Sequence, residues 1–198
     1  MAKVLVIKTS MMGANSISNV LNDKFMEYYK EKNPNDEFIY MNLNDEKMAS
    51  ITMTSHNMKE YFVAEYSDKY INQLKKVDKV VMSVPMTNFN VNAVTKNYLD
   101  HISVADKTFS YKYSKKGEAI GLLDHLSVQI LTTQGAPLGW YPWGNHSEYL
   151  KGHWRFLGAK VADHILVDSV KIGENSKKTP QEIIEKFDGE IKKAAYSF

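Results

Sequence analysis

Hydroxyl side chains cluster near the start of the chain, at a spacing that suits phosphate binding. Ser10, Ser16 and Ser18 follow the apolar run 3–8, and beyond them apolar residues recur at helical spacing up to Tyr28. A strand that enters a helix through such a loop presents unpaired backbone N–H groups and the positive end of the helix dipole. The loop matches neither the glycine-rich dinucleotide pattern nor the nucleoside-triphosphate pattern with its lysine. We therefore expect a phosphate that belongs to another kind of ligand.

Two later loops have the composition of a site for a flat ring. Residues 85–90, Pro-Met-Thr-Asn-Phe-Asn, combine a rigid proline with apolar and amide side chains. Residues 133–145 supply Gly135, where a ligand can approach the backbone closely, and aromatic rings for stacking. In an open α/β sheet, the loops at the carboxyl ends of the strands meet at the edge where ligands bind. A phosphate beside a planar ring indicates flavin mononucleotide (FMN).

The elements that position these loops alternate between strand and helix. Near-continuous apolar runs predict buried parallel strands, and amphipathic stretches predict the helices between them. The expected strands span residues 4–8, 38–43, 79–84, 127–132 and 164–169, and the expected helices span residues 16–32, 57–75, 92–103, 147–157 and 180–195. This alternation predicts a doubly wound α/β fold, an open parallel sheet with helices on both faces, in one domain over residues 1–198.

Residues 107–113 depart from that alternation. They alternate in period two and predict an extended segment with Phe109, Tyr111 and Tyr113 on one face.

Composition limits the class of protein. The chain has 198 residues, 43% of them hydrophobic, and a net charge of +2, which gives no reason to expect nucleic acid or a membrane as partner. Its basic residues are lysines except Arg155, so arginine clamps are not the anion-binding device. Cysteine is absent, which excludes disulfides, thiol nucleophiles and thiolate metal sites. Because the first strand begins at once and no apolar run approaches the ~20 residues of a membrane span, we expect a cytoplasmic protein.

Side chains for acid–base, nucleophilic or metal chemistry are not gathered in any motif. His101, His125, His146 and His153 are scattered over different expected elements and lack carboxylates at metal-ligand spacing. No nucleophile elbow of the hydrolase type occurs. We expect no metal and no catalytic side chain, which leaves the chemistry to the cofactor.

Three stretches of the chain resemble FMN-dependent NADH-azoreductases, a family of flavodoxin-like NAD(P)H:quinone oxidoreductases. They are residues 3–18, residues 85–90 with the Lys-Asn-Tyr-Leu-Asp run at 96–100, and the Thr-Phe-Ser-Tyr run at 108–111. The resemblance implies a five-stranded sheet of order 2-1-3-4-5 and a homodimer with one tightly bound FMN per subunit. It also implies a ping-pong reaction in which NADH or NADPH reduces the flavin and a quinone or azo compound reoxidises it.

By this resemblance, twelve residues fall where the family contacts FMN. They are Ser10, Ser16, Ile17 and Ser18 in the first loop, Met86, Thr87, Asn88 and Phe89 in the second, and Thr133, Gln134, Gly135 and Ala136 in the third. Ile17 stands where a glutamine is common and Thr87 where a tyrosine is usual. The change at Thr87 removes an aromatic side chain beside the flavin and bears on substrate preference.

We expect the substrate pocket to include Phe109, Tyr111, Trp140 and His146. The family position of Phe109 and Tyr111 implies this role, although both could instead cover the edge of the sheet. Trp140 lies in an aromatic loop that could equally form a dimer contact, because aromatic residues are enriched in interfaces. His146 follows in the same loop, where it could donate to the carbonyl edge of the flavin ring.

Three other functions stay open at this point. A one-electron carrier of the flavodoxin type shares the expected fold, but such carriers are usually strongly acidic. An acyl-carrier-protein phosphodiesterase would need a metal cluster or a nucleophile–base pair that the sequence does not supply. A flavin-binding regulatory module is the third.

Overall fold

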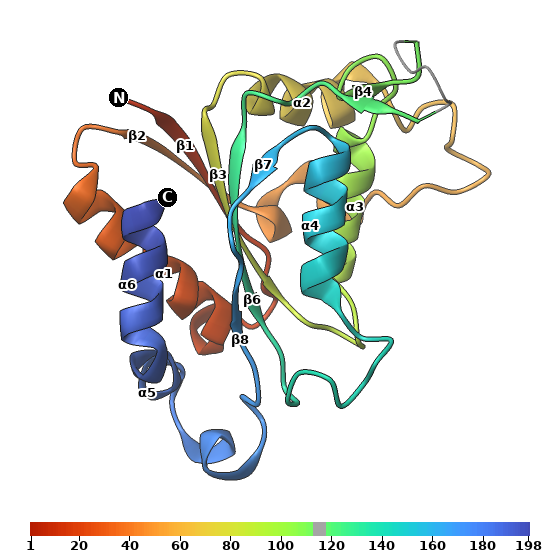
Figure 1. Cartoon of the computed structure of the whole chain (residues 1–198). Helices are drawn as coiled ribbons and strands as arrows, with labels where there is room; N and C mark the ends of the chain where they lie inside the picture. The colour runs from red at the N-terminus through yellow and green to blue at the C-terminus, as the bar shows by residue number, and fades with distance from the viewer. Residues whose placement is uncertain (113–117) are drawn as a thin grey trace.

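A parallel sheet forms the centre of the computed structural model, which describes residues 1–112 and 118–198 (Figure 1). Its order is β2 (Glu37–Asn42), β1 (Lys3–Lys8), β3 (Lys79–Pro85), β6 (Ser127–Thr133) and β7 (Lys160–Val161), and β8 (Ile165–Val167) also pairs with β6. Every one of these pairings is parallel. Because β7 and β8 share the outer edge of β6, the predicted strand order 2-1-3-4-5 is confirmed.

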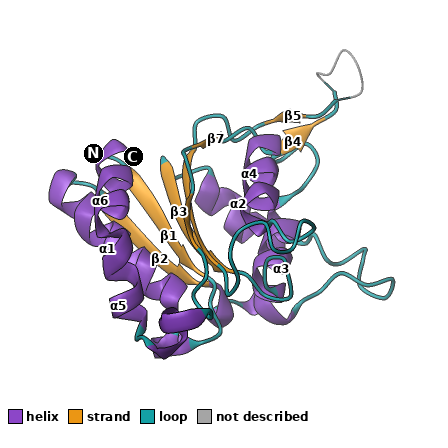
Figure 2. Ribbon diagram, turned by 60° about the horizontal axis from the view of Figure 1, so that its bottom comes forward, coloured by secondary structure: helices purple, strands orange, loops and turns teal. Residues whose placement is uncertain are grey.

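Helices cover both faces of the sheet (Figures 1 and 2). One layer contains α1 (Ile17–Lys32), α5 (Pro180–Ile184) and α6 (Asp188–Ser197), and the other contains α2 (Lys69–Leu74), α3 (Ala93–Ile102) and α4 (His146–Phe156). Short 3-10 turns span Gly13–Asn15, Leu43–Asp45, Lys47–Ser50, Gly173–Lys177 and Glu185–Phe187.

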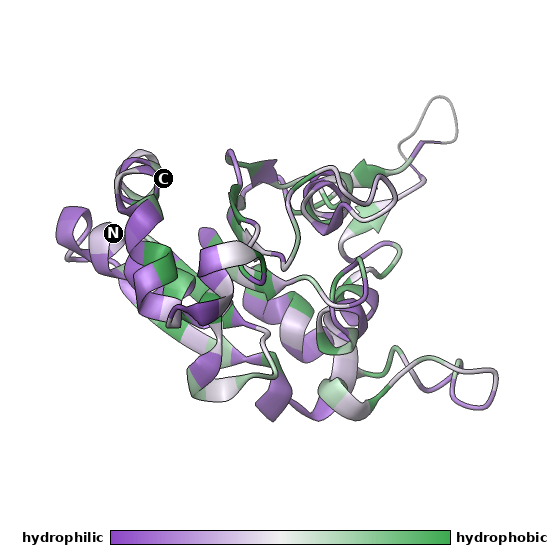
Figure 3. Cartoon of the chain, turned by 90° about the horizontal axis from the view of Figure 1, so that it is seen from below, coloured by the Kyte–Doolittle hydropathy of each residue, from purple (hydrophilic) through white to green (hydrophobic). Residues whose placement is uncertain are grey.

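Alternate residues of β1 pack against different helix layers. Val4 and Val6 belong to the apolar cluster that includes Phe25 of α1, whereas Leu5 and Ile7 belong to the cluster on the other face. All four strand residues are fully buried. A strand covered on both faces reads as a continuous apolar run, which is why this strand could be predicted. Figure 3 shows hydrophobic segments gathered between the helix layers.

The fifth strand is broken into two pieces and begins earlier than the expected residue 164. β7 pairs with the start of β6 and β8 with its end. Between them the Gln129 side chain of β6 donates to Asp163 O (2.9 Å), in place of a regular ladder bond. The strand therefore exists as predicted, but residues 162–164, which include the polar Asp163 and His164, interrupt it.

The helix expected over residues 57–75 is wrong for its first half. Residues 55–62 form turns, a π-helix follows at Ala64–Asp68, and only α2 is α-helical. Asn57 explains the loss, since its side chain accepts from Thr54 N (2.7 Å) and donates to Thr52 O (3.0 Å). Such side-chain bonds to the local backbone compete with helix formation.

The last expected helix and the extended segment are each confirmed in part. A 3-10 turn at Glu185–Phe187 divides residues 180–195 into α5 and α6. Within the extended segment, β4 (Phe109–Ser110) pairs antiparallel with β5 (Ile120–Gly121), away from the main sheet (Figure 2). Tyr113 lies outside the described residues. Among the residues that are described, no helix is long and apolar enough to cross a membrane.

Candidate functional site

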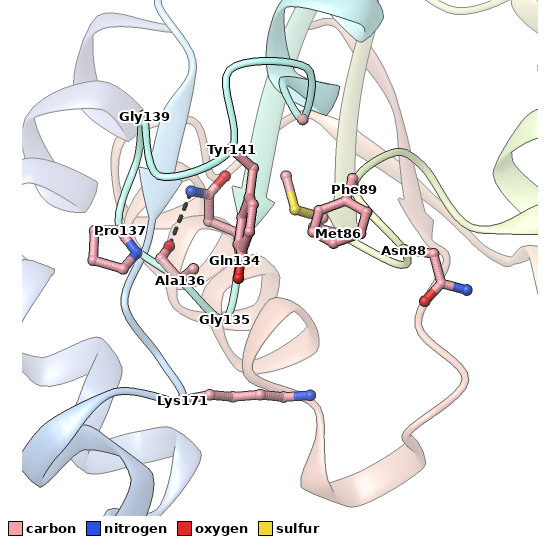
Figure 4. Close-up of a pocket in the computed structure, with 11 residues that line it drawn as sticks. Met86, Asn88, Phe89, Gln134, Gly135, Ala136, Pro137, Gly139, Tyr141 and Lys171 are labelled. Carbon is pink, nitrogen blue, oxygen red and sulfur yellow. Dashed lines mark hydrogen bonds between the residues drawn. The ribbon is translucent and has the colours of Figure 1, made fainter.

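Two adjoining cavities lie where β1, β3 and β6 end. The larger has a volume of about 360 Å³ and is lined by the loops that follow these strands. The smaller has a volume of about 210 Å³ and extends into the aromatic loop (Figure 4). Five residues line both of them, namely Met86, Asn88, Gln134, Gly135 and Lys171. We call the two together the cleft.

The β1–α1 end of the cleft is built from hydroxyls and unpaired backbone donors. Ser16 caps α1 by accepting from Asn19 N (3.1 Å), and its Oγ lies 3.1 Å from Ser18 Oγ. The Ile17 and Ser18 N–H groups, the first two donors of the helix, have no hydrogen-bond partner in the described part of the chain. Free N–H groups at a helix N-terminus are an anion site, so this end can hold a phosphate.

The loop after β3 forms a strained turn that faces the cleft. Thr87 N donates to Asn90 O (2.8 Å) and Asn90 N donates to Thr87 O (3.1 Å). Between them Asn88 and Phe89 have φ angles of 48° and 71°, in the left-handed region. Asparagine tolerates this region, but for a phenylalanine it costs about 1–3 kcal/mol. Strain of this kind is typical of a functional loop, and here it holds Phe89 at the wall of the smaller cavity.

The loop after β6 is held in place by the segment that follows β8, residues 168–171. Their hydrogen bonds run from Lys171 N to Gly135 O (3.0 Å), Val170 N to Gln134 O (3.2 Å), Ser169 N to Ala136 O (3.2 Å) and Leu138 N to Asp168 Oδ2 (2.7 Å). Sequence reasoning missed this segment and with it Lys171, which lines both cavities. The position of this segment could have been predicted, because the fifth strand ends at the same edge of the sheet as the others.

Three aromatic rings meet at the outer end of the cleft. The Phe89 ring centroid lies 4.8 Å from that of Tyr141 and 5.8 Å from that of Trp143. Tyr141 lines the smaller cavity, whereas the neighbouring Trp140 lines neither and is 59% exposed. The sequence identified this loop as aromatic, but only the structure selects Tyr141 and Trp143 as the partners of Phe89.

All twelve residues predicted to contact FMN line the cleft. Phe89 and Ala136 line the smaller cavity, and the other ten line the larger. Their contact with a cofactor stays a prediction.

The four residues predicted for the substrate pocket do not line the cleft of a single chain. Phe109 and Tyr111 lie on and beside β4, at the end of the molecule where the parallel strands begin (Figure 1). His146 starts α4 and is fully buried, and burial lowers its pKa to about 4, so its ring is neutral. A role for these residues toward a substrate stays a prediction.

Comparison with known proteins defines first the class and then the family. The model of the flavodoxin-like fold matches residues 2–191. The solved structure of an azoreductase from Bacillus anthracis is 26% identical, with a TM-score of 0.83 and coverage of 100% of both chains. An FMN-dependent NADH:quinone oxidoreductase of Malacoplasma penetrans is 60% identical over 100% of this chain and 94% of the relative. One of Mycoplasma mobile is 58% identical over 99% of this chain and 98% of the relative. The chain belongs to the flavodoxin-like family of FMN-dependent NADH:quinone oxidoreductases.

Proposed function

We propose that this chain is an FMN-dependent oxidoreductase that carries two electrons from NADH to quinones, and to aromatic azo compounds, in a ping-pong reaction. The observation that carries the proposal is the cleft, in which free backbone donors at one end adjoin an apolar, aromatic wall at the other. The relatives that match the whole chain are named for this NADH:quinone activity, and the azoreductase shares the fold over its full length.

The donor set of the cleft suits FMN at both of its ends. Two free N–H groups, the serine hydroxyls and the dipole of α1 can bind a phosphate dianion. At the other end, the Gly135 and Ala136 N–H groups have no hydrogen-bond partner among the described residues. They are free to donate to the polar edge of a flat ring whose face rests on Met86 and Phe89. We therefore propose that the twelve predicted residues hold FMN.

The protein contributes position and polarity more than reactive side chains. The chemistry that FMN would supply when bound is two-electron hydride transfer between NADH and the acceptor. The turn at residues 87–90 and the loop after β6 fix the orientation of the ring from two sides. The backbone N–H groups of Gly135 and Ala136 would stabilise negative charge that develops on the edge of the ring. We assign no side chain as acid, base or nucleophile, because the transfer of a hydride to the ring needs none.

The alternative functions are not favoured. The relatives at 60% and 58% identity are named as oxidoreductases rather than as electron carriers or hydrolases. A phosphodiesterase of the metal-dependent kind needs a cluster of ligands. Among the residues that the structure describes, no three His, Asp or Glu side chains are grouped to hold a metal.

We also propose that the enzyme is a cytoplasmic homodimer in which Phe109 and Tyr111 of a second copy close the cleft. Apolar residues around the mouth support a subunit contact, since Met11, Met12, Leu138, Trp140 and Trp143 are each more than half exposed. A dimer would also explain how residues at the opposite end of one chain serve a substrate pocket. The cytoplasmic location follows from the use of NADH, a reductant of the cell interior.

A single variant tests this arrangement. We expect Phe109→Ala to change the ratio of kcat/KM between a quinone and an azo dye severalfold, while the affinity for FMN stays that of the parent. The control is Tyr28→Phe. Tyr28 lies in α1, in the helix layer on the other face of the sheet from Phe109, and its hydroxyl donates to Asp188. Sedimentation must show a dimer, and a monomer with full activity contradicts the proposal.

The function itself is tested on the purified protein. We expect a yellow preparation whose released cofactor is FMN, loss of the flavin absorbance when NADH is added without oxygen, and its return when a quinone or azo dye follows. A colourless protein that does not bind added FMN refutes the proposal. A flavin that NADH does not reduce refutes the enzymatic part and supports a binding module.

A further inference from the structure

Lys171 is the single charged side chain among the described residues that line the cleft. The other lining residues are hydroxyl, amide, apolar, aromatic or glycine. In the part of the chain that the structure describes, no carboxylate forms an ion pair with its ammonium group. Lys171 is exposed, so solvent can satisfy its charge, but it is the one cation that a ligand in either of the two cavities would meet.

The base and the stem of Lys171 are both held against Gly135. The backbone N–H of Lys171 donates to Gly135 O (3.0 Å). A Cβ added at Gly135 would lie only 3.2 Å from Lys171 Cδ and 3.4 Å from its Cγ, so the methylene stem lies directly over the glycine. In Figure 4 the side chain runs extended below Gly135, and its ammonium lies toward the side of Asn88. The stem of Lys171 is therefore packed against the loop after β6, at the wall that the two cavities share.

We propose that Lys171 binds the pyrimidine edge of the FMN ring and stabilises the negative charge that reduction places there. This inference rests on the proposed function. The phosphate has its own donors at α1, in the hydroxyl part of the larger cavity. Lys171 also lines the smaller cavity, with Phe89 and Tyr141, where none of the three serines is found. Its stem crosses Gly135, whose N–H is free to donate to the same edge of the ring.

The negative charge that Lys171 stabilises follows from the electrons and protons that the reaction transfers. Hydride transfer turns NADH into NAD⁺ and adds two electrons and one proton to the neutral ring, which is left with one negative charge. A nearby cation favours this reduced state over the oxidised one. Lys171 therefore raises the reduction potential of the enzyme and sets how readily NADH reduces it.

The test compares the FMN-loaded parent with Lys171→Met, which keeps the length of the side chain, and Lys171→Arg, which keeps its charge. We expect Lys171→Met to weaken binding of reduced FMN about tenfold more than binding of oxidised FMN. This lowers the two-electron midpoint potential by about 30 mV. Lys171→Arg stays near the parent. Lys177→Met is the matched control, because Lys177 lies six residues further on, outside the cleft, and pairs with Glu174 (3.5 Å).

The pH dependence of the potential provides a second readout that a merely structural role would not change. With the cation present, reduction takes up one proton for two electrons, and the potential falls by about 30 mV per pH unit. Without it the ring takes up a second proton, and we expect a fall nearer to about 60 mV per pH unit. Lys171→Gln serves the same comparison if the methionine variant does not fold.

Two outcomes overturn the assignment. One is a Lys171→Met enzyme with the potential and pH dependence of the parent. The other is a variant that loses affinity for FMN but not for riboflavin at an unchanged potential, since Lys171 would then bind the phosphate. Failure of the proposed function gives a different result from these two outcomes. In that case the parent protein binds no FMN, or NADH does not reduce it.

Discussion

At the scale of single residues, Ser16 has two tasks that can be separated. Its Oγ caps α1 through Asn19 N, and it stands beside Ser18 Oγ at the free N–H groups of the helix. We expect Ser16→Ala combined with Ser18→Ala to weaken FMN binding by about tenfold to a hundredfold, because two donors to a charged phosphate are lost. Flavin fluorescence titration measures the change.

Loss of the cap alone must be controlled. Thr179 caps α5 through Glu182 N and is not among the residues that line the cleft, and Thr179→Ala costs stability of the same kind, about 1 kcal/mol. We expect both variants to melt earlier, but only the serine pair to lose FMN affinity. If the double serine variant retains FMN as tightly as the parent, the phosphate assignment is wrong.

At the scale of elements, Asn92 joins the end of β1 to the start of α3. Its Oδ1 accepts from Thr95 N (3.1 Å) and its Nδ2 donates to Thr9 O (2.7 Å), with the side chain buried. Asn92→Ala removes a helix cap and leaves a buried carbonyl without a donor, so we expect unfolding to become easier by about 2–3 kcal/mol. Asn145→Ala removes only the exposed cap of α4 and should cost about 1 kcal/mol. Urea unfolding at one fixed FMN concentration compares the two, and equal losses would contradict the bridging role.

At the scale of the whole molecule, the buried His146 and the partly buried His153 make stability depend on pH. Burial lowers the pKa of His146 and of His153, each to about 4, below the ordinary value of about 6.5. The unfolded chain therefore binds protons more readily, and stability falls as the pH drops from about 6.5 to 4, by up to about 1.4 kcal/mol per pH unit for each histidine. Unfolding in urea at pH 7.5, 6 and 5 measures the slope. His153→Gln should reduce it and the exposed His56→Gln should not, whereas a flat profile would contradict the prediction.

The extent of the sheet along the chain concerns the number of domains. One domain over residues 1–198 stays a prediction, supported by a single sheet that unites strands from Lys3–Lys8 to Ile165–Val167. The family model, which matches residues 2–191, agrees with that extent.

The sequence by itself determined the parallel sheet and the loops that form most of the cleft. Strands buried on both faces, such as residues 4–7, must be apolar throughout, and parallel strands bring their carboxyl ends to one edge. The serines at the start of α1 and the residues after β3 and β6 therefore met where expected.

Only the tertiary structure decided the features that depend on partners distant in the sequence. The bond from Gln129 to Asp163 breaks the fifth strand, and the bonds of residues 168–171 to the loop after β6 bring Lys171 into the cleft. The placement of Phe109 at the end of the molecule where the parallel strands begin also depends on such partners. Local patterns report which residues are buried and where helices are capped. They do not report which distant backbone groups a side chain or a loop will bond, because that depends on how the finished layers pack.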